Sequence, residues 1–303
     1  MKIIAVVIWF KPRRSECENI SLLLSQFDEV ILVDNTHGEM GNVVPRYPQD
    51  ERCIVVQNAN RGGIARGLNI GVQVALDRRA EYVALFDQDT SPPVDFRARM
   101  EAHAASDHPN YLFPVCVDVR TGQLIKTTVV RRFWFRKVSI ADENAEDARI
   151  VLTSGSVISA ACFEAVGEFR EEFFIDHVDT DFCIRLIRKN LRIQLCNDVV
   201  MQHALGNILS GTKAREAWKP YNYPPTRTYF RIRNATVLIT ENILSMPGIS
   251  LFLLRAITRE FIAVLLFEGQ KLKKLRAFFL GWRHGLTYIL AGRMPILESE
   301  ESL

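Results

Sequence analysis

Two aspartates one residue apart, Asp87 and Asp89, directly follow the apolar segment Tyr82–Phe86. Carboxylate oxygens are the ligands that Mg²⁺ and Mn²⁺ prefer. A divalent cation bound there could neutralise the charge that a pyrophosphate leaving group gains when its bond to a sugar breaks. Alternatively, the two acids begin a loop and cap a helix that starts near Pro93. The pattern therefore indicates a nucleotide–metal site or a helix cap.

A second motif, residues 60–71, opens a predicted helix with glycines and two arginines (Asn-Arg-Gly-Gly-Ile-Ala-Arg-Gly-Leu-Asn-Ile-Gly). Free N–H groups and the positive end of a helix dipole suit phosphate, and Arg66 could reach a pyrophosphate. The spacing is not Gly-x-Gly-x-x-Gly, which disfavours a Rossmann dinucleotide site. The alternative role of the glycines is a tight turn with close packing of the helix on a sheet.

Three acids, Asp176, Asp179 and Asp181, surround another predicted helix start. Acids there are favourable to the helix dipole and could simply cap the helix. Alternatively, one carboxylate takes a proton from an acceptor hydroxyl. His203, further along the chain, is either a surface histidine or a metal ligand.

The elements that must position these residues alternate along the first half of the chain. Apolar runs predict strands and amphipathic stretches predict helices: strands Ile3–Phe10, Val30–Val33, Cys53–Gln57 and Tyr82–Phe86, and helices Cys17–Phe27 and Gly62–Arg79. Short, continuously apolar strands are typical of a mainly parallel sheet covered on both faces. Ligands of such a doubly wound α/β fold bind at the carboxyl ends of the strands, where Asp34-Asn35, residues 58–63 and residues 87–89 fall.

The middle of the chain changes character. Tyr111–Val119 and Leu124–Phe135 predict a β-hairpin, and Ile193–Leu195 predicts a short strand. After Pro220 the pattern is mostly helical. Between Met246 and Met294, eight Lys/Arg stand against two Glu on a segment rich in Leu, Phe and Ile.

Composition narrows the class of protein. With 303 residues, 48% apolar and 24% charged, the chain can bury a substantial core, and its net charge of +3 gives no indication of a nucleic-acid partner. The six cysteines show no zinc spacing, which predicts free thiols in a reducing cytosol. The apolar start is short and lacks a small-residue cleavage site, so it predicts a buried first strand. No apolar run reaches the length of a membrane-spanning helix.

Taken in order, the motifs resemble those of the family 2 inverting glycosyltransferases. They are Val-Asp-Asn at 33–35, the glycine-rich motif, Asp-x-Asp, Ser-Gly-Ser at 154–156, Phe-Ile-Asp-x-Val-Asp-Thr-Asp-Phe-Cys-x-Arg at 174–185, a following His, and Tyr-Phe-Arg-x-Arg-Asn at 229–234. The Val-Asp-Thr-Asp-Phe-Cys-x-Arg version resembles the bacterial rhamnosyltransferase branch. The likeness covers about residues 3–235 and implies a GT-A type α/β fold with a mixed, mainly parallel sheet, followed by a C-terminal helical segment.

On the donor side, the resemblance implies a role for each matching residue. Asp34 resembles the acid that binds the base of the nucleotide. Asn60 and Gly63 occupy the loop near the donor, and Asp87 contacts the ribose region.

On the chemical side, the resemblance implies that Asp89 and His203 hold Mg²⁺ or Mn²⁺ and that Asp179 is the catalytic base. Asp181 is a rival for the role of base that the sequence does not separate from Asp179.

The resulting hypothesis is an inverting transfer of L-rhamnose from dTDP-L-rhamnose to a surface polysaccharide such as an O-antigen, or to its lipid-linked precursor. The alternatives are a nucleotidyltransferase, which also uses paired acids and metal, and a non-catalytic sugar-binding protein of the same fold.

The predicted organisation is a catalytic domain, 1–220, with a donor-binding half (about 1–110) and an acceptor half (about 111–220), then a helical segment, 221–303. The basic, apolar tail predicts contact with a membrane surface or a second subunit. We therefore expect a cytoplasmic protein, with peripheral attachment to the inner face of the cytoplasmic membrane as the alternative to subunit contact.

Overall fold

The computed structural model describes residues 1–36, 47–107, 110–118, 122–138, 149–203, 220 and 222–292, with only the main chain at Arg14, Ser15, Ser106, Asp107 and His203. Its contacts divide the chain into two units. The sheet unit comprises Met1–Val129, Lys137–Phe174 and Val178–Ala204, and the helical unit comprises Val130–Arg136, Ile175–His177 and the chain from Leu205. The predicted domain boundary near residue 220 adjoins 204–219, which lie outside the described residues, and it stays a prediction.

The strands are β1 (Ile3–Trp9), β2 (Val30–Asp34), β3 (Cys53–Gln57), β4 (Tyr82–Asp87), β5 (Tyr111–Asp118), β6 (Thr127–Val130), β7 (Phe135–Val138), β8 (Arg149–Ile150), β9 (Ser156–Ser159) and β10 (Ile193–His203). The helices up to β10 are α1 (Arg14–Leu24), α2 (Gly63–Asp77), α3 (Phe96–Asp107), α4 (Ala160–Val166), the 3₁₀ turn η1 (Glu171–Phe173) and α5 (Val178–Arg188).

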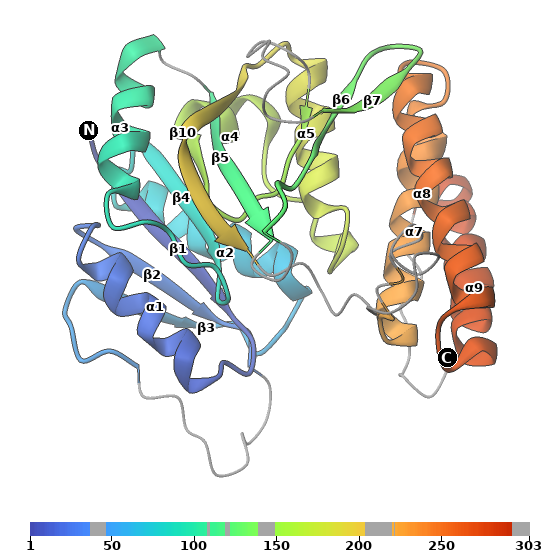
Figure 1. Ribbon diagram of the computed structural model, residues 1–303, viewed down its shortest axis with the longest axis horizontal. Helices are drawn as coiled ribbons and strands as arrows, with labels where there is room; N and C mark the ends of the chain where they lie inside the picture. The colour runs from blue at the N-terminus through green and yellow to red at the C-terminus, as the bar shows by residue number, and fades with distance from the viewer. Residues whose placement is uncertain are drawn as a thin grey trace. The chain divides into compact units, whose positions relative to one another are not determined.

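A seven-stranded sheet in the order β10-β5-β9-β4-β1-β2-β3 forms the centre of the sheet unit (Figure 1). β9 runs antiparallel to β4 and β5, and the other neighbouring strands are parallel. A smaller sheet has the order β7-β6-β8. The predicted α/β fold with a mixed, mainly parallel sheet is therefore confirmed.

Helices cover both faces of the large sheet. Alternate residues of β1, namely Ala5, Val7 and Trp9, share one apolar core with side chains of α1 and α3. On the opposite face, Gly71 of α2 lies so close to Val6 that an added Cβ would overlap it. Every residue of β1 and β2 is buried, as expected for parallel strands covered on both sides.

Two segments differ from the prediction. β10 has 11 residues and continues to His203 after a register shift between Cys196 and Val200, well beyond the short strand expected. The expected hairpin forms only in part: Val117 bridges Leu124, but β5 lies between β9 and β10. β10 pairs along the length of β5 and β9 pairs with its first two residues, and the second arm of the expected hairpin joins the smaller sheet as β6.

The helical unit contains α7 (Pro225–Asn242), α8 (Pro247–Leu266) and α9 (Lys271–Ala291), so the predicted C-terminal helices are present. α7 packs against both α8 and α9. Gly285 allows a close approach, since a Cβ there would lie 2.7 Å from the Cβ of Thr236. Among the described residues, no helix is both long and apolar enough to cross a bilayer.

Candidate active site

Asp34 ends β2 with a buried carboxylate whose position is fixed by two hydrogen bonds. It accepts from the Thr36 amide at 2.7 Å and from the Tyr47 hydroxyl at 2.5 Å. Burial and the neighbouring Asp34 raise the pKa of Tyr47, which keeps its hydroxyl protonated and able to donate. The Tyr47 ring stacks on Trp9 at 5.9 Å between centroids. A fixed acceptor beside an aromatic ring is an arrangement that can bind a nucleotide base.

A buried amide network holds the loop between β3 and α2. The Asn58 side chain donates to Asn35 Oδ1 at 2.7 Å and to the Arg61 carbonyl at 2.8 Å, and Asn35 donates to the Gly63 carbonyl at 3.1 Å. Asn60 has a positive φ of 54° within this loop. The ends of β2 and β3 are therefore joined at the edge of the sheet, as the sequence predicted.

The first amides of α2 already have a partner. Ile64 and Ala65 donate to the Phe174 carbonyl at 2.9 and 3.4 Å. Gly63 has a φ of +64°, and a Cβ there would overlap the Phe174 carbonyl oxygen. The glycine-rich motif thus allows a tight turn and close packing, the second of the two interpretations of this sequence. The amides of Ile64 and Ala65 are occupied by the Phe174 carbonyl and are not free for phosphate. Arg66 is half-exposed and lies 3.9 Å from Glu171, a weak ion pair that an anionic ligand could displace.

Main-chain and side-chain contacts fix the turn that carries Asp87 and Asp89. The Asp87 amide donates to Ser154 Oγ at 3.0 Å, and Gln88 Oε1 accepts from the Phe10 amide at 2.7 Å. Asp87 is partly buried, whereas Asp89 is exposed on the turn. Gln88 therefore ties the turn to the end of β1 and leaves the second carboxylate facing solvent.

The same turn lies beside the end of β10. Ser91 forms an antiparallel bridge with Gln202, the residue before His203, so the backbone brings the Asp89 and His203 segments together. The side chain of His203 lies outside the described residues. Among the side chains that are described, no three His, Cys, Asp or Glu residues form a group that could hold a metal.

The acids around the start of α5 have different surroundings. Asp181 is 4% exposed and pairs with Arg185 at 2.9 Å and with Arg170 at 3.5 Å. Asp179 is half-buried at the second residue of the helix and accepts from the Thr180 amide at 2.7 Å. Asp176 lies two residues before the helix, and Asp179 and Asp181 lie in its first turn, so the three acids surround the helix start as the sequence predicted. Two arginines therefore neutralise Asp181.

Residues 17–166 match the family described as glycosyl transferase family 2. The chain contains a glycosyl transferase family 2 domain. The matched region carries the loop, the glycine-rich motif and the Asp87–Asp89 turn, whereas α5 and β10 follow it. The predicted relationship to this family is therefore confirmed.

The chain is also similar in sequence to two glycosyltransferases and in fold to solved structures of a third protein. The chain is 26% identical over 246 residues to the dTDP-rhamnosyl transferase RfbF of Shigella flexneri, covering 79% of this chain and 80% of that protein. It is 21% identical over 207 residues to the low-salt glycan biosynthesis hexosyltransferase Agl10 of Haloferax volcanii, covering 66% of each. The structure of S. aureus TarS 1–349 has a similar fold, with a TM-score of 0.56 at 15% identity over 97% of this chain and 92% of that chain. A TarS complex with UDP-GlcNAc has the same TM-score at 15% identity, covering 98% of this chain and 95% of that one.

Sequence reasoning missed two residues that shape the site of the family 2 domain. Ser154 Oγ accepts a hydrogen bond from the Asp87 amide and lies 2.6 Å from Thr90 Oγ1. The Ser-Gly-Ser motif therefore supports the turn that carries Asp87 and Asp89. Tyr47 holds Asp34, but it stands 13 residues away with no local pattern to indicate the contact. The Ser-Gly-Ser motif is visible in the sequence, but nothing in its spacing indicates the contact of Ser154 with the Asp87 amide.

Proposed function

We propose that this glycosyltransferase moves L-rhamnose from dTDP-L-rhamnose, with inversion and with the help of a divalent metal, onto a hydroxyl of a surface polysaccharide or its lipid-linked precursor. The observation that carries the proposal is the meeting of Asp34 and the Asp87–Asp89 turn at one edge of the sheet. β1 lies between β2 and β4, and its residues Trp9 and Ile8 are in register with Asp34 and Asp87. The choice of donor is supported by the relative named as a dTDP-rhamnosyl transferase.

In this proposal, the strand-edge residues bind the nucleotide. Asp34 accepts a hydrogen bond from the base while its own position is held by Tyr47. Asp87 contacts the ribose, and Arg66 leaves its weak pair with Glu171 to contact the diphosphate. Asn60 and Gly63 shape the loop near the donor. TarS structures with UDP and with UDP-GlcNAc support a nucleotide-sugar partner for a protein of this fold.

Asp89 and His203 are the residues that would hold Mg²⁺ or Mn²⁺. The fit rests on the exposed carboxylate of Asp89 and on the bridge that aligns its turn with the end of β10. Carboxylate oxygen and imidazole nitrogen are both suitable ligands for Mn²⁺, and oxygen suits Mg²⁺. When bound, the metal would neutralise charge on the leaving diphosphate.

Asp179 then acts as the base. Its carboxylate takes the proton from the acceptor hydroxyl, whose oxygen forms a bond to the anomeric carbon as the bond from that carbon to the diphosphate breaks. A single displacement of this kind inverts the anomeric configuration. Asp181 is a poor candidate for the base, because its carboxylate is 4% exposed and is held in ion pairs with two arginines.

A donor panel tests the proposal. The purified protein is incubated with Mn²⁺, a set of rhamnosyl and N-acetylglucosaminyl glycosides as acceptors, and each of dTDP-L-rhamnose, UDP-glucose, UDP-galactose and UDP-N-acetylglucosamine. We expect fastest nucleoside diphosphate release from dTDP-L-rhamnose and a product of opposite anomeric configuration by NMR. Preferential use of a UDP-hexose would refute the rhamnosyl assignment. Pyrophosphate release from dTTP and a sugar 1-phosphate would instead favour a nucleotidyltransferase.

The surface of α8 and α9 supports a further part of the proposal, contact with an anionic membrane. Large apolar side chains are exposed there, among them Leu254 (50%), Leu272 (84%) and Phe279 (55%). The two acids of this region, Glu260 and Glu268, are held in ion pairs, and the lysines and arginines of α8 and α9 outnumber them. Basic residues beside apolar ones favour an anionic leaflet. This part of the proposal places the enzyme in the cytoplasm, on the inner face of the membrane.

Liposome flotation checks this part. Binding should need anionic lipid, weaken as salt is raised, and be lost in a Leu272→Glu, Phe279→Glu double variant that leaves donor turnover intact. If the wild type does not float and the same substitutions break a dimer in solution, the surface is a subunit interface.

A further inference from the structure

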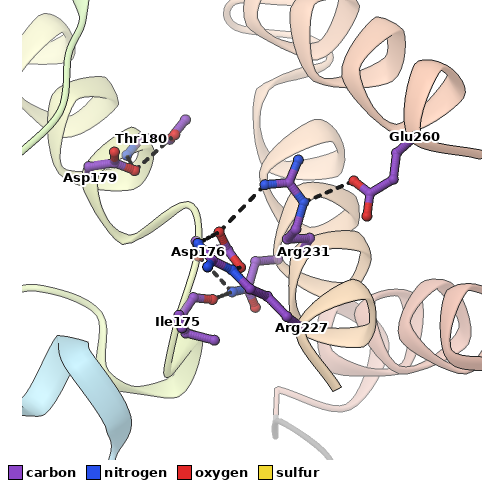
Figure 2. A network of polar contacts seen from close by, with 8 residues as sticks. Ile175, Asp176, Asp179, Thr180, Arg227, Arg231 and Glu260 are labelled. Atoms are coloured by element: carbon purple, nitrogen blue, oxygen red, sulfur yellow. Dashed lines mark hydrogen bonds and ion pairs between the residues drawn. The ribbon is translucent and has the colours of Figure 1, made fainter. Parts of the chain in front are cut away.

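A largely buried network in the helical unit holds Ile175 and Asp176, which lie just before α5. Arg227 Nε and Nη2 contact the two carboxylate oxygens of Asp176 at 2.9 and 3.1 Å (Figure 2). Arg231 Nη1 lies 3.5 Å from the same carboxylate, and its Nε donates to Glu260 at 2.9 Å. We call Arg227, Arg231, Asn234 and Glu260 the α7 clamp.

The fourth member of the clamp binds main chain. Asn234 is fully buried, and its Nδ2 donates at 2.9 Å both to the Ile175 carbonyl and to the Asp176 carbonyl. Arg233 donates to Asn234 Oδ1 at 2.9 and 3.0 Å, which fixes the orientation of the amide. The clamp therefore fixes the backbone of this segment as well as one side chain, a contact that charge neutralisation alone would not need.

The clamped segment has an unfavourable backbone conformation. Phe174, Asp176 and His177 all have positive φ angles, of 62°, 62° and 60°. Asp and His tolerate the left-handed region better than most residues, but a bulky Phe does not. Such a conformation persists only where surrounding contacts enforce it, and it is concentrated at functional sites. The enforcing contacts are the α7 clamp at Ile175 and Asp176 and the α2 amides at Phe174.

The composition of the clamp also indicates a role in geometry. Asp176, Arg231 and Glu260 have side chains 9%, 19% and 11% exposed, and Arg227 covers the carboxylate from a position that is 37% exposed. Buried ion pairs seldom add more stability than well-packed apolar residues of similar size, whereas planar arginine–carboxylate pairs fix orientation. Two acids, Asp176 and Glu260, balance the charges of two arginines, Arg227 and Arg231.

We infer that the α7 clamp sets the position of the catalytic base. Asp176, Arg227, Arg231 and Asn234 are positioning residues: they fix the segment 175–177, and α5 begins at the next residue with Asp179 in its first turn. The inference rests on the proposed role of Asp179.

The test compares Asp176→Asn with a matched control. Asn has the size of Asp and tolerates a positive φ, so the variant removes the charge and spares the shape. The control, Glu268→Gln, removes a buried acid of the same unit that pairs with Lys274 at 2.7 Å and does not touch the clamped segment. We expect Asp176→Asn to lower kcat about 100-fold, the scale of a misplacement of about 1 Å, with donor KM within about twofold. Asp176→Glu should recover part of the loss.

A second readout separates this inference from the proposed function. Hydrogen–deuterium exchange at residues 174–182 should be faster in Asp176→Asn and unchanged in Glu268→Gln, whatever the substrate. If Asp176→Asn does not fold, Arg227→Gln is the milder variant, since it keeps the Arg231–Glu260 pair, and a loss of about tenfold in kcat is expected. An active Asp179→Asn would refute the proposed base and leave the exchange result standing. Equal kcat and equal exchange in the clamp variants and the control would overturn the clamp.

Discussion

The two neighbouring acids of α5 provide the sharpest test of the site. Asp181→Asn removes a charge that is 4% exposed and paired with Arg185 and Arg170 at 2.9 and 3.5 Å. Breaking a buried pair costs about 3–5 kcal/mol because the partner charge is left behind. Both arginine side chains are 25% exposed, so water recovers part of this energy, and we expect a loss of about 2–3 kcal/mol.

In thermal unfolding this loss corresponds to a Tm decrease of about 4–12 °C, at about 2–4 °C per kcal/mol for a unit of this size. Asp181→Asn should still turn over donor at a temperature well below its Tm. Asp179→Asn should behave in the opposite way. Its amide oxygen can still accept from the Thr180 amide, so we expect a smaller decrease in Tm than for Asp181→Asn, together with a kcat lower by about 10²–10⁴, the usual contribution of a general base. The assays are differential scanning fluorimetry and nucleoside diphosphate release at 15 °C.

A double variant serves as the control. Adding Arg185→Gln to Asp181→Asn should recover part of the lost stability, because removing both partners leaves less uncompensated charge. The assignment of Asp179 as the base is wrong if Asp181→Asn keeps the wild-type Tm and loses turnover, or if Asp179→Asn remains active. Either outcome would move the base from Asp179 to its neighbour.

Three further predictions concern the metal site, the packing of α2 and a buried histidine. Asp89→Asn, His203→Ala and EDTA treatment of the wild type should each abolish most transfer, and full activity in EDTA would exclude a metal requirement. Gly71→Ala should lower the free energy of unfolding by about 1–3 kcal/mol in urea, because its Cβ would overlap Val6; an unchanged midpoint would contradict the packing. Burial and Arg231 lower the pKa of His177 to about 4 from 6.5. Below pH 6.5 the unfolded chain therefore binds a proton at this histidine that the folded protein does not, so the free energy of unfolding should fall as the pH drops from 6.5 toward 4. His177→Asn should flatten that part of the stability–pH profile, and an unchanged profile would show that other groups cause the slope.

The strand ends of the site could be predicted because each apolar run is followed at once by a polar residue. Val30–Val33 leads to Asp34, and Tyr82–Phe86 leads to Asp87. In a parallel sheet these ends share one edge, and the observed register confirms that they do. The sequence pattern therefore predicts which residues lie at the carboxyl ends of the strands, without any knowledge of side-chain contacts.

The contacts that hold these ends could not be predicted in the same way. Ser154 and Asp87 are 67 residues apart, and Asn58 and Asn35 are 23 apart. A hydrogen bond between distant segments leaves no periodic trace in either segment. Local spacing does carry information where both partners lie on one helix: Asp181 and Arg185 are four residues apart and form an ion pair, so the sequence held a reason to separate Asp181 from Asp179.

The Tyr-Phe-Arg-x-Arg-Asn motif at 229–234 binds a segment that lies much earlier in the chain. Its residues Arg231 and Asn234 contact Asp176 and its neighbour, more than 50 residues earlier, and Arg231 also contacts Glu260 of α8. A C-terminal truncation intended to test membrane binding would remove Glu260 and leave Arg231 partly uncompensated. Loss of activity in such a truncation would therefore say nothing about membranes. Substitutions at exposed positions such as Leu272 spare these contacts, and only they separate attachment to a membrane from the positioning of the base.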